Sequence, residues 1–568
     1  MSPKHLVLAA AIGALAASPA ALAIGETDPI LDPAQCNQSS LFGEYNAPKR
    51  FASAEMEIKK GISAEELAAR RADLHQWLTT SQPVMERLQP LRIELTRQDL
   101  IDMGVEPCHN CFKLQADPRR YQVGVAKGIG FDIDFGELDV GQAQKNGVAS
   151  FRNGVVGTGP DGELVWTVEV TSPGATALRI GFEDFKLPPG AQMFVYNELG
   201  DAYGPYREWG PNDTGVFATN ATVGDTAYLQ LHYYGAQSRK ALDNVQFTIE
   251  DIGHLGPRFE KIARTLRPEA FTEKAFCEWN ESCIENVNCT SSSVVNDARS
   301  AVAEMVYRSG GGYYICTGGL LADTDTSSVV PYFLTANHCV SKSGEANSLE
   351  TYFDFEVSCG VSGKDCPRYG ETVPMQTLGA TIVATDRTSD FTLLQLAATP
   401  GGTRAYLGWN NAEIAFTDGA GLHRISHPGG SPQAYSAHNV DTSKGTCRTW
   451  PRGNWIYSTD TVGATEGGSS GSPVLNSNGE VVGQLSGGCG TNVNVSCDSE
   501  NNATVDGAFA AYFGQVQPFL DPSGGDGGGD GEDPPPACDL LPSGSQCTDD
   551  SQCCSGKCKG KPGERTCN

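Results

Sequence analysis

Residues 467–473 read GGSSGSP and set Ser470 among glycines, which let the backbone turn tightly. Hydrolysis of an amide bond needs an activated nucleophile, a base that takes and returns its proton, and donors for the developing oxyanion. A turn of this kind presents one hydroxyl beside two backbone N–H groups. We therefore predict that Ser470 is a nucleophile and that the N–H groups of Gly468 and Ser470 form an oxyanion hole.

A carboxylate opens the stretch SDFTLLQL, residues 389–396, which continues as an apolar and alternating run. This pattern predicts a strand inside a barrel, with Asp390 at its start. Asp386 is an alternative, but it lies in a polar turn that no strand follows directly. We therefore predict that Asp390 is the carboxylate that orients the base.

A third stretch, YFLTANHC at residues 332–339, is an apolar run that ends in a histidine beside a cysteine. It resembles the histidine motif of chymotrypsin-like serine proteases, and the chain order His338, Asp390, Ser470 is the order of that family. The resemblance implies a mostly β fold with a double β-barrel. It also implies that His338 is the general base of a serine mechanism that needs neither a cofactor nor a metal.

Within that family, residues 277–520 resemble the bacterial lysyl endopeptidases. The features that carry this resemblance are the cysteines at 283 and 289, Leu407-Gly408-Trp409, His427-Pro428-Gly429 and the strand-like run at 481–485. The resemblance implies a disulfide between Cys316 and Cys339. Ser469 stands where trypsin and chymotrypsin carry an aspartate, so activation by an ion pair with a newly cut N-terminus is not expected here.

The same resemblance implies a substrate pocket that is lined by Ser486, Gly487, Gly488, Ala511 and His427. Ala511 is included in this pocket because residues 512–516 match the last strand of the lysyl endopeptidases. This match places Ala511 where those enzymes carry an aspartate. A lysine-selective pocket needs a buried carboxylate to compensate the substrate ammonium. Asp506 and Asp498 are alternatives, but each is expected in an exposed loop. We therefore expect a preference for uncharged residues on the amino side of the scissile bond.

The beginning of the chain has the pattern of an export signal. Residues 1–23 combine a short basic start, an apolar stretch and a small-residue site that predicts cleavage after Ala23. Residues 24–120 are expected to form a helical pro-region, because a capping box at residues 63–66 precedes apolar positions at helical spacing. These positions are Leu67, Leu74 and Leu78.

Residues 121–265 change to short alternating stretches between Gly, Pro, Asn and Asp, for example at 164–170 and 227–233. Period-two alternation with frequent turns predicts a β-sandwich. This sandwich resembles the prosegments of the lysyl endopeptidases. We expect the N-terminal region to assist folding, or to block the cleft until the chain is cut near residues 265–280.

The C-terminal end predicts a linker and a small module. Residues 521–537 are rich in Gly, Asp and Pro and cannot bury a core, which predicts a flexible linker. Residues 538–568 hold six cysteines and resemble a knottin, a disulfide-rich module without a large core. Knottins have no fixed activity, so the partner of this tail, an unknown surface or protein, stays open.

Composition narrows the class of protein. A net charge of −27 argues against binding of nucleic acid, which requires a basic surface. Outside the signal no apolar run is long enough for a membrane span, so we expect a secreted protein without membrane insertion.

The 19 cysteines of a secreted chain indicate disulfides. The pairing of Cys36, Cys108 and Cys111 stays open, and a local disulfide at Cys108–Cys111 is favoured over a metal site.

Three histidines, His423, His427 and His438, lie close together in the sequence. No Glu or Asp companions suggest a hydrolytic zinc site, so structural roles are favoured. The sequence as a whole predicts a secreted serine endopeptidase that acts on protein or peptide substrates and is made as a precursor. The alternative is an inactive secreted binding protein that uses the sandwich and the knottin-like module.

Overall fold

The computed structural model describes part of the chain, namely residues 51–81, 89–106, 120–139, 148–271, 281–325, 327, 330–359, 374–447, 449–522, 558–559 and 566–567. The expected signal peptide, Cys36 and the Cys108–Cys111 pair lie outside these residues. We call the described residues 51–271 the N-terminal region and 281–522 the double-barrel region. None of the described helices is long and apolar enough to cross a membrane.

By the contacts of its residues, the chain divides into two units, Met1–Pro522 and Ser523–Asn568. In the second unit, β31 (Cys558–Lys559) and β32 (Thr566–Cys567) pair in antiparallel fashion. The other four cysteines of the knottin-like module, Cys538, Cys547, Cys553 and Cys554, lie outside the described residues, as does almost all of the expected linker.

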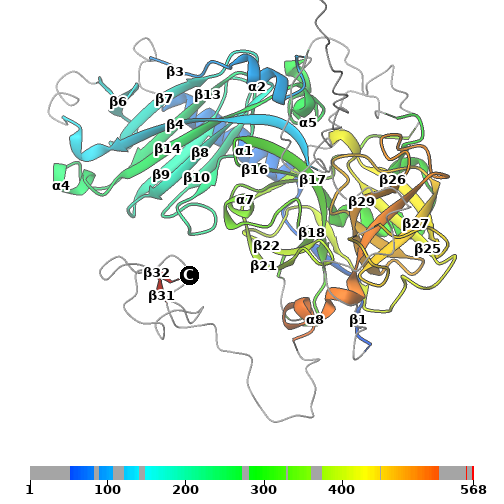
Figure 1. The fold of residues 1–568 in the computed structure, drawn as a ribbon. Helices are drawn as coiled ribbons and strands as arrows, with labels where there is room; N and C mark the ends of the chain where they lie inside the picture. The colour runs from blue at the N-terminus through cyan, green and yellow to red at the C-terminus, as the bar shows by residue number, and fades with distance from the viewer. Residues whose placement is uncertain are drawn as a thin grey trace, which may run out of the picture. The chain divides into compact units, whose positions relative to one another are not determined.

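Two sheets form a sandwich in the N-terminal region (Figure 1). The first runs in the order β10-β9-β13-β7-β6-β5, and the second begins β11-β8-β14-β4. The strands are β4 (Tyr121–Asp134), β5 (Val148–Phe151), β6 (Gly154–Thr158), β7 (Leu164–Thr171), β8 (Ala177–Lys186), β9 (Ala191–Tyr196), β10 (Ala202–Tyr206), β11 (Phe217–Ala218), β12 (Thr222–Val223), β13 (Thr226–Tyr233) and β14 (Gln246–Leu255). The strands predicted at 164–170 and 227–233 are confirmed as β7 and β13.

The second sheet of the sandwich does not end at β4. The first residues of β4 pair with β17 (Gly312–Leu321), so that one twelve-stranded sheet continues into the double-barrel region as β4-β17-β16-β19-β20. Figure 1 shows β4 running from the sandwich toward β16 and β17. The two regions are therefore joined by backbone hydrogen bonds as well as by side chains.

Two barrels follow. The strands of the first are β16 (Val302–Ser309), β17, β18 (Tyr332–Ala336), β19 (Glu350–Phe353), β20 (Met375–Leu378), β21 (Ala380–Asp386) and β22 (Phe391–Leu396). The pairings run β20-β19-β16-β17-β18-β22-β21, and only Gly379 separates β20 from β21, which closes the ring. The small helix α7 (Ser343–Asn347) precedes β19.

The second barrel contains β25 (Gly421–Ser426), β26 (Ala434–Val440), β27 (Trp455–Val462), β28 (Pro473–Asn476), β29 (Val481–Gly490) and β30 (Asn502–Ala508). Strand β29 pairs with both β28 and β30, and the pairings β28-β25-β26-β27-β30 complete this ring. Short elements lie around it, namely β15 (Glu285–Asn286), α6 (Ser293–Ala298), β23 (Thr403–Tyr406) and β24 (Trp409–Asn410). The expected mostly β fold with a double barrel is confirmed.

The beginning of the N-terminal region is only partly helical. Helix α1 (Ala64–Thr80) starts as the capping pattern predicts, because the Ser63 side chain accepts from the N–H of Glu66 at 3.2 Å. The helical expectation is wrong for the residues before it. There β1 (Ser53–Ala54) pairs with β24, and β2 (Glu57–Lys60) pairs with β23. Pairing with distant strands overrides local propensity in such short segments.

The rest of the N-terminal region consists of small elements that pack on the sandwich and the first barrel, namely β3 (Leu91–Arg92), α2 (Arg97–Asp102), α4 (Arg239–Leu242) and α5 (Glu260–Leu266). One apolar cluster joins the two regions. In it, Val123, Leu255 and Phe259 of the N-terminal region pack with Tyr313 and Ile315 of β17. The chain closes on the double-barrel region with helix α8 (Phe509–Leu520).

Candidate active site

Asp390 and His338 lie side by side between the two barrels. The Nδ1 atom of His338 lies 2.6 Å from Oδ2 of Asp390, and the backbone N–H of His338 donates to Oδ1 at 2.8 Å. Both residues are buried, at 4% and 3% exposure. The carboxylate thus fixes both the ring plane and the backbone of the histidine, so that Nδ1 carries the proton and Nε2 faces away from Asp390.

The backbone of Asp390 is held by neighbours that are distant in sequence. Its φ of 53° lies in the left-handed region, directly before β22 begins at Phe391. The Asp390 carbonyl accepts from the N–H of Asn337 at 2.8 Å, and the side-chain amide of Gln484 donates to it at 3.2 Å. These contacts offset the cost of an unfavourable backbone conformation and keep the carboxylate in position.

Ser470 lies in a tight turn that ends just before β28. Gly468 and Gly471 adopt φ angles of 101° and 83°, which favour glycine. Within the described part of the chain, the N–H groups of Gly468 and Ser470 donate to no acceptor, whereas those of Ser469, Gly471 and Ser472 all donate to carbonyls. The two N–H groups predicted for the oxyanion hole are therefore the two that this turn leaves available.

The Ser470 turn is tied to β17, which pairs with β18, the strand that leads to His338. The N–H of Thr317 in β17 donates to the Ser470 carbonyl at 2.8 Å, and the Thr317 hydroxyl donates to the Gly468 carbonyl, also at 2.8 Å. The Nε2 atom of His338 has no hydrogen-bond partner among the described residues. Nε2 therefore stays available as a hydrogen-bond acceptor, on the side of the imidazole ring that faces away from Asp390.

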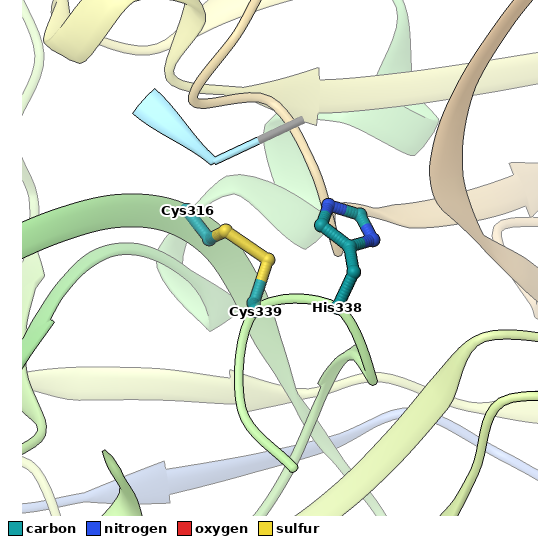
Figure 2. A group of neighbouring side chains, drawn as sticks. All are labelled: Cys316, His338 and Cys339. Atoms are coloured by element: carbon teal, nitrogen blue, oxygen red, sulfur yellow. A yellow bond between two sulfur atoms is a disulfide. The ribbon is translucent and has the colours of Figure 1, made fainter. Parts of the chain in front are cut away.

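A disulfide joins Cys316 and Cys339 beside the imidazole (Figure 2). His338 and these two cysteines are the one group of potential metal ligands that converges in the described ranges. Because the two sulfurs are bonded to each other, they are not thiolate ligands. Three further disulfides, Cys283–Cys497, Cys289–Cys359 and Cys447–Cys489, link distant parts of the double-barrel region.

The three clustered histidines each have a separate partner. His423 contacts the hydroxyl of Tyr435 at 2.9 Å, His427 contacts the carbonyl of Ser431 at 2.9 Å, and His438 contacts the hydroxyl of Ser458 at 3.1 Å. Burial lowers the pKa of all three rings, and that of His427 falls to about 4. Their contacts agree with the structural roles that we favoured.

This geometry can be compared with known proteins. Residues 277–507 match the family model of the lysyl endopeptidase C-terminal domain. The lysyl endopeptidase of Pseudomonas aeruginosa is 34% identical over 215 residues, which cover 36% of this chain and 44% of that protein. The secreted RxLR effector protein 73 of Plasmopara viticola is 27% identical over 202 residues, 34% of this chain and 46% of that protein. The chain thus matches less than half of the length of each relative.

Solved structures give more distant likenesses. The Rv3671c protease of M. tuberculosis in its active form is 16% identical, with a TM-score of 0.26, over 43% of this chain and 91% of that one. The HtrA-type protease AlgW with a tripeptide is 16% identical, with a TM-score of 0.28, over 41% of this chain and 64% of that one.

The pocket residues implied by the lysyl endopeptidase resemblance differ in exposure: Ser486 and His427 are buried, whereas Gly487 and Gly488 are partly exposed. Ser486 is fully buried, and its hydroxyl donates to Oδ2 of Asp390, so its side chain supports the carboxylate. Gly487 and Gly488 follow it on β29 and are partly exposed. His427 is fully buried and stacks on Phe355 with ring centroids 5.6 Å apart, so it lies below the surface of the cleft.

Two expectations about the pocket are wrong. Residues 512–516 form part of helix α8, not a last strand, and Ala511 lies on this helix against an apolar cluster of the second barrel. Asp506 does not lie in an exposed loop either. It is fully buried in β30, where it forms an ion pair with Arg424. Asp498 does lie in a loop, with Asn492 and Asn501 as hydrogen-bond partners.

Sequence reasoning missed the residues that support the candidate triad. Tyr512 in α8 donates to the side-chain carbonyl of Gln484 at 2.6 Å, and the amide of Gln484 donates to the Ser389 and Asp390 carbonyls. The Tyr512 ring also stacks on Phe391 at 4.0 Å. The sequence holds no local signal for these contacts, because each of them joins segments that lie far apart in the chain.

The N-terminal region contacts residues next to His338 and next to Ser470. Tyr121 pairs with Ile315, the residue before Cys316, and Arg120 donates from Nε to the His338 carbonyl at 2.5 Å. A Cβ atom on Gly467 would lie 3.1 Å from the Tyr121 ring. The beginning of β4 therefore lies between the His338 side and the Ser470 side of the candidate active site.

Proposed function

We propose that the double-barrel region is a serine endopeptidase that hydrolyses peptide bonds in proteins. The observation that carries the proposal is the pair of contacts from Asp390 to Nδ1 and to the backbone N–H of His338, at 2.6 and 2.8 Å. It is supported by the match of residues 277–507 to a peptidase family. The available N–H groups of Gly468 and Ser470 add a site for an oxyanion.

In the proposed mechanism, Nε2 of His338 removes the proton of the Ser470 hydroxyl while its oxygen attacks the substrate carbonyl. The N–H groups of Gly468 and Ser470 stabilise the oxyanion that forms. His338 then returns the proton to the leaving amine, and an acyl-enzyme remains on Ser470. A water molecule then attacks the acyl-enzyme with the same help from His338, and the carboxylic acid product leaves Ser470. Asp390 keeps Nδ1 protonated and stabilises the positive ring.

Substitution and labelling test the proposal. Ser470→Ala in the processed protein is expected to lower kcat by about a millionfold, because the nucleophile is lost. A mechanism-based phosphonate is expected to label the parent protein at Ser470 and to leave the variant unlabelled. Ser472→Ala, which changes a neighbouring buried hydroxyl, is the control. An unlabelled parent that cleaves no peptide would favour the binding-protein alternative.

We also propose that the chain is a secreted precursor whose N-terminal region covers the cleft. Arg120 supports this proposal, because it holds β4 in the site through the His338 carbonyl, the Ser309 hydroxyl and an ion pair with Glu345. A peptide substrate cannot occupy the same space. Cleavage of the chain near residues 265–280 would allow the N-terminal region to leave the candidate active site.

The block can be measured on the uncut chain. The uncut chain is expected to cleave a small peptide more slowly than the processed chain, and Arg120→Ala is expected to raise that rate. Arg92→Ala, which removes an exposed ion pair with Glu94, is expected to change nothing. Full activity in a protein whose sequence starts at Ile24 would overturn the precursor proposal.

The preference for uncharged residues on the amino side of the scissile bond stays our proposal. Arg424 already neutralises Asp506, so this aspartate has its own charge partner. The side chain nearest to a Cβ atom built on Gly487 is that of Trp450, at 3.8 Å, which favours apolar contacts. A peptide library whose cleavage profile is dominated by Lys or Arg at that position would contradict it.

A further inference from the structure

Glu304 in β16 is a buried carboxylate that the proposed mechanism does not use. Its side chain is fully buried, and neither carboxylate oxygen has a hydrogen-bond partner among the described residues. His427 lies 3.9 Å from Oε2 through Nδ1, but this atom already contacts the Ser431 carbonyl at 2.9 Å. Burial lowers the pKa of His427 to about 4, so this ring is neutral near pH 7 and supplies no cation.

One lysine of the N-terminal region acts on Glu304 through its charge, without a direct contact. Lys261 of α5 donates to the Ser431 hydroxyl at 2.6 Å, and the Glu304 carboxylate raises the pKa of this lysine against the larger effect of burial. Arg258 lies over the Tyr121 ring at 4.9 Å. A Cβ atom on Gly430 would lie 3.4 Å from Oε1 of Glu304 and 3.5 Å from the Arg258 carbonyl. The acid therefore faces the docked N-terminal region.

The position of Glu304 is tied to the candidate oxyanion hole. It pairs across the strands with Thr317, whose hydroxyl donates to the Gly468 carbonyl and accepts from the N–H of His427. The N–H of Gly429 donates to the Gly467 carbonyl at 2.7 Å. Glu304 thus lies directly behind the loop that shapes the site, next to the cleft.

Within the described ranges, β4 of the N-terminal region covers the edge of β17 that lies opposite β16. Residues 312–315 pair with β4, and Ile315 adjoins the Cys316–Cys339 disulfide, on the side where His338 must protonate the leaving amine. An extended peptide can add to such an edge by strand pairing. Side chains of the substrate that follow the scissile bond would then reach the space that Tyr121 and Lys261 occupy in the precursor.

Given the proposed protease activity, we propose that Glu304 forms the base of a cation-binding subsite. Lys261 stabilises the charge of Glu304 in the precursor without a direct ion pair, and a lysine or arginine on the leaving-group side of the substrate pairs with it in the processed enzyme. Burial raises the pKa of Glu304 well above its usual value, and Lys261 lowers it only in part, so the charged form is costly unless a further cation compensates it. Removal of the N-terminal region takes Lys261 away, and a basic substrate side chain supplies that further cation.

Matched peptides test the subsite on the processed enzyme. They carry lysine, norleucine or glutamate in turn at the first, second and third residue after the scissile bond. At one of these positions, lysine is expected to raise kcat/KM about tenfold over norleucine, and glutamate to lower it. Glu304→Gln is expected to abolish the lysine advantage, so that the ratio of kcat/KM between the lysine and norleucine peptides falls to about one. The exposed Glu413→Gln is the control.

The outcomes separate this inference from the proposed function. If the norleucine peptides are cleaved and lysine gives no advantage, or keeps its advantage in Glu304→Gln, the subsite is refuted and the protease stands. If no peptide is cleaved, the proposed function itself fails.

A second measurement covers the case in which Glu304→Gln does not fold after processing. It uses urea unfolding of the uncut Ser470→Ala chain. Lys261→Met is expected to shift the unfolding constant about tenfold in the Glu304 chain and much less in the Glu304→Gln background. Additive effects of the two substitutions would refute the charge interaction of Lys261 with Glu304.

Discussion

At the scale of single residues, Asp390 performs two tasks through its two oxygens. Oδ2 receives the imidazole Nδ1 of His338 and the Ser486 hydroxyl, and Oδ1 receives the backbone N–H of His338. An amide in place of the carboxylate would put an N–H donor against at least one of these donors. The contacts therefore require a carboxylate, and not merely a polar side chain.

Asp390→Asn tests this requirement. It is expected to lower kcat of the processed enzyme by about ten-thousandfold, because the histidine then adopts the wrong tautomer. The measurement is kcat near pH 7, together with thermal unfolding to show that the protein folds. Asp386→Asn, which removes a carboxylate only four residues away, is the control. Greater loss of activity in Asp386→Asn than in Asp390→Asn would overturn the assignment.

His254 in β14 is expected to make the stability of the uncut chain depend on pH. Burial, which outweighs the attraction of Asp99 and Asp225, lowers the pKa of this ring from its usual 6.5 to about 4. The unfolded chain thus binds a proton near pH 6.5, whereas the folded chain binds it only near pH 4. The contribution to stability is complete above pH 6.5 and is lost as the pH falls toward 4, up to about 3 kcal/mol.

Urea unfolding of the uncut Ser470→Ala chain checks this effect between pH 7 and pH 4. His254→Gln is expected to reduce the loss of unfolding free energy across this interval, whatever its effect at pH 7. An unchanged slope would show that His254 is not the group responsible. His427, whose pKa is also about 4, is expected to contribute to the slope that remains.

At the scale of elements, helix α8 anchors the loop that carries Asp390. The hydroxyl of Tyr512 donates to Gln484, which holds the Ser389 and Asp390 carbonyls. Tyr512→Phe keeps the ring that stacks on Phe391 but removes the hydroxyl. We expect the unfolding free energy to fall by about 1–3 kcal/mol, because the buried carbonyl of Gln484 loses a donor. Tyr332→Phe, at a partly exposed tyrosine, is the control.

The activity of the same variant distinguishes positioning from bulk stability. If Gln484 orients the loop, Tyr512→Phe also lowers kcat, whereas KM changes little. A fall in stability with unchanged kcat would show that α8 stabilises the fold without positioning Asp390.

Elements were predicted well from sequence where local pattern decides them. Strands β7 and β13 follow their alternation, and α1 begins at its predicted cap. Prediction failed for β1 and β2, whose partner strands lie far along the chain, and for α8, whose short apolar run also fits a strand. Of the candidate site, the motifs predicted His338, Asp390 and Ser470. The structure brings His338 to Asp390, and the catalytic roles of all three stay a proposal. Gln484 and Tyr512 were not predicted, because their contacts are non-local.

At the scale of the whole molecule, the N-terminal region and the double barrel share one sheet and several buried charges. Arg179 of β8 lies 3.6 Å from Glu350 of β19 with both side chains fully buried, and it donates to the Ser348 carbonyl at 2.8 Å. Arg308 of β16 pairs with Asp251 of β14. Separation of the two regions would leave these charges without their partners, which is costly.

This coupling predicts that the uncut Ser470→Ala chain unfolds up to residue 522 in one transition. A shared sheet and an apolar cluster built from both regions couple the unfolding of the two regions. Hydrogen exchange, followed at β13 in the sandwich and at β29 in the second barrel, is expected to give the same midpoint in urea. Distinct midpoints would mean that β4 and β17 separate before the sandwich or the barrels unfold. The N-terminal region could then leave the cleft without a cut, and the precursor proposal would have to rest on equilibrium opening instead of processing.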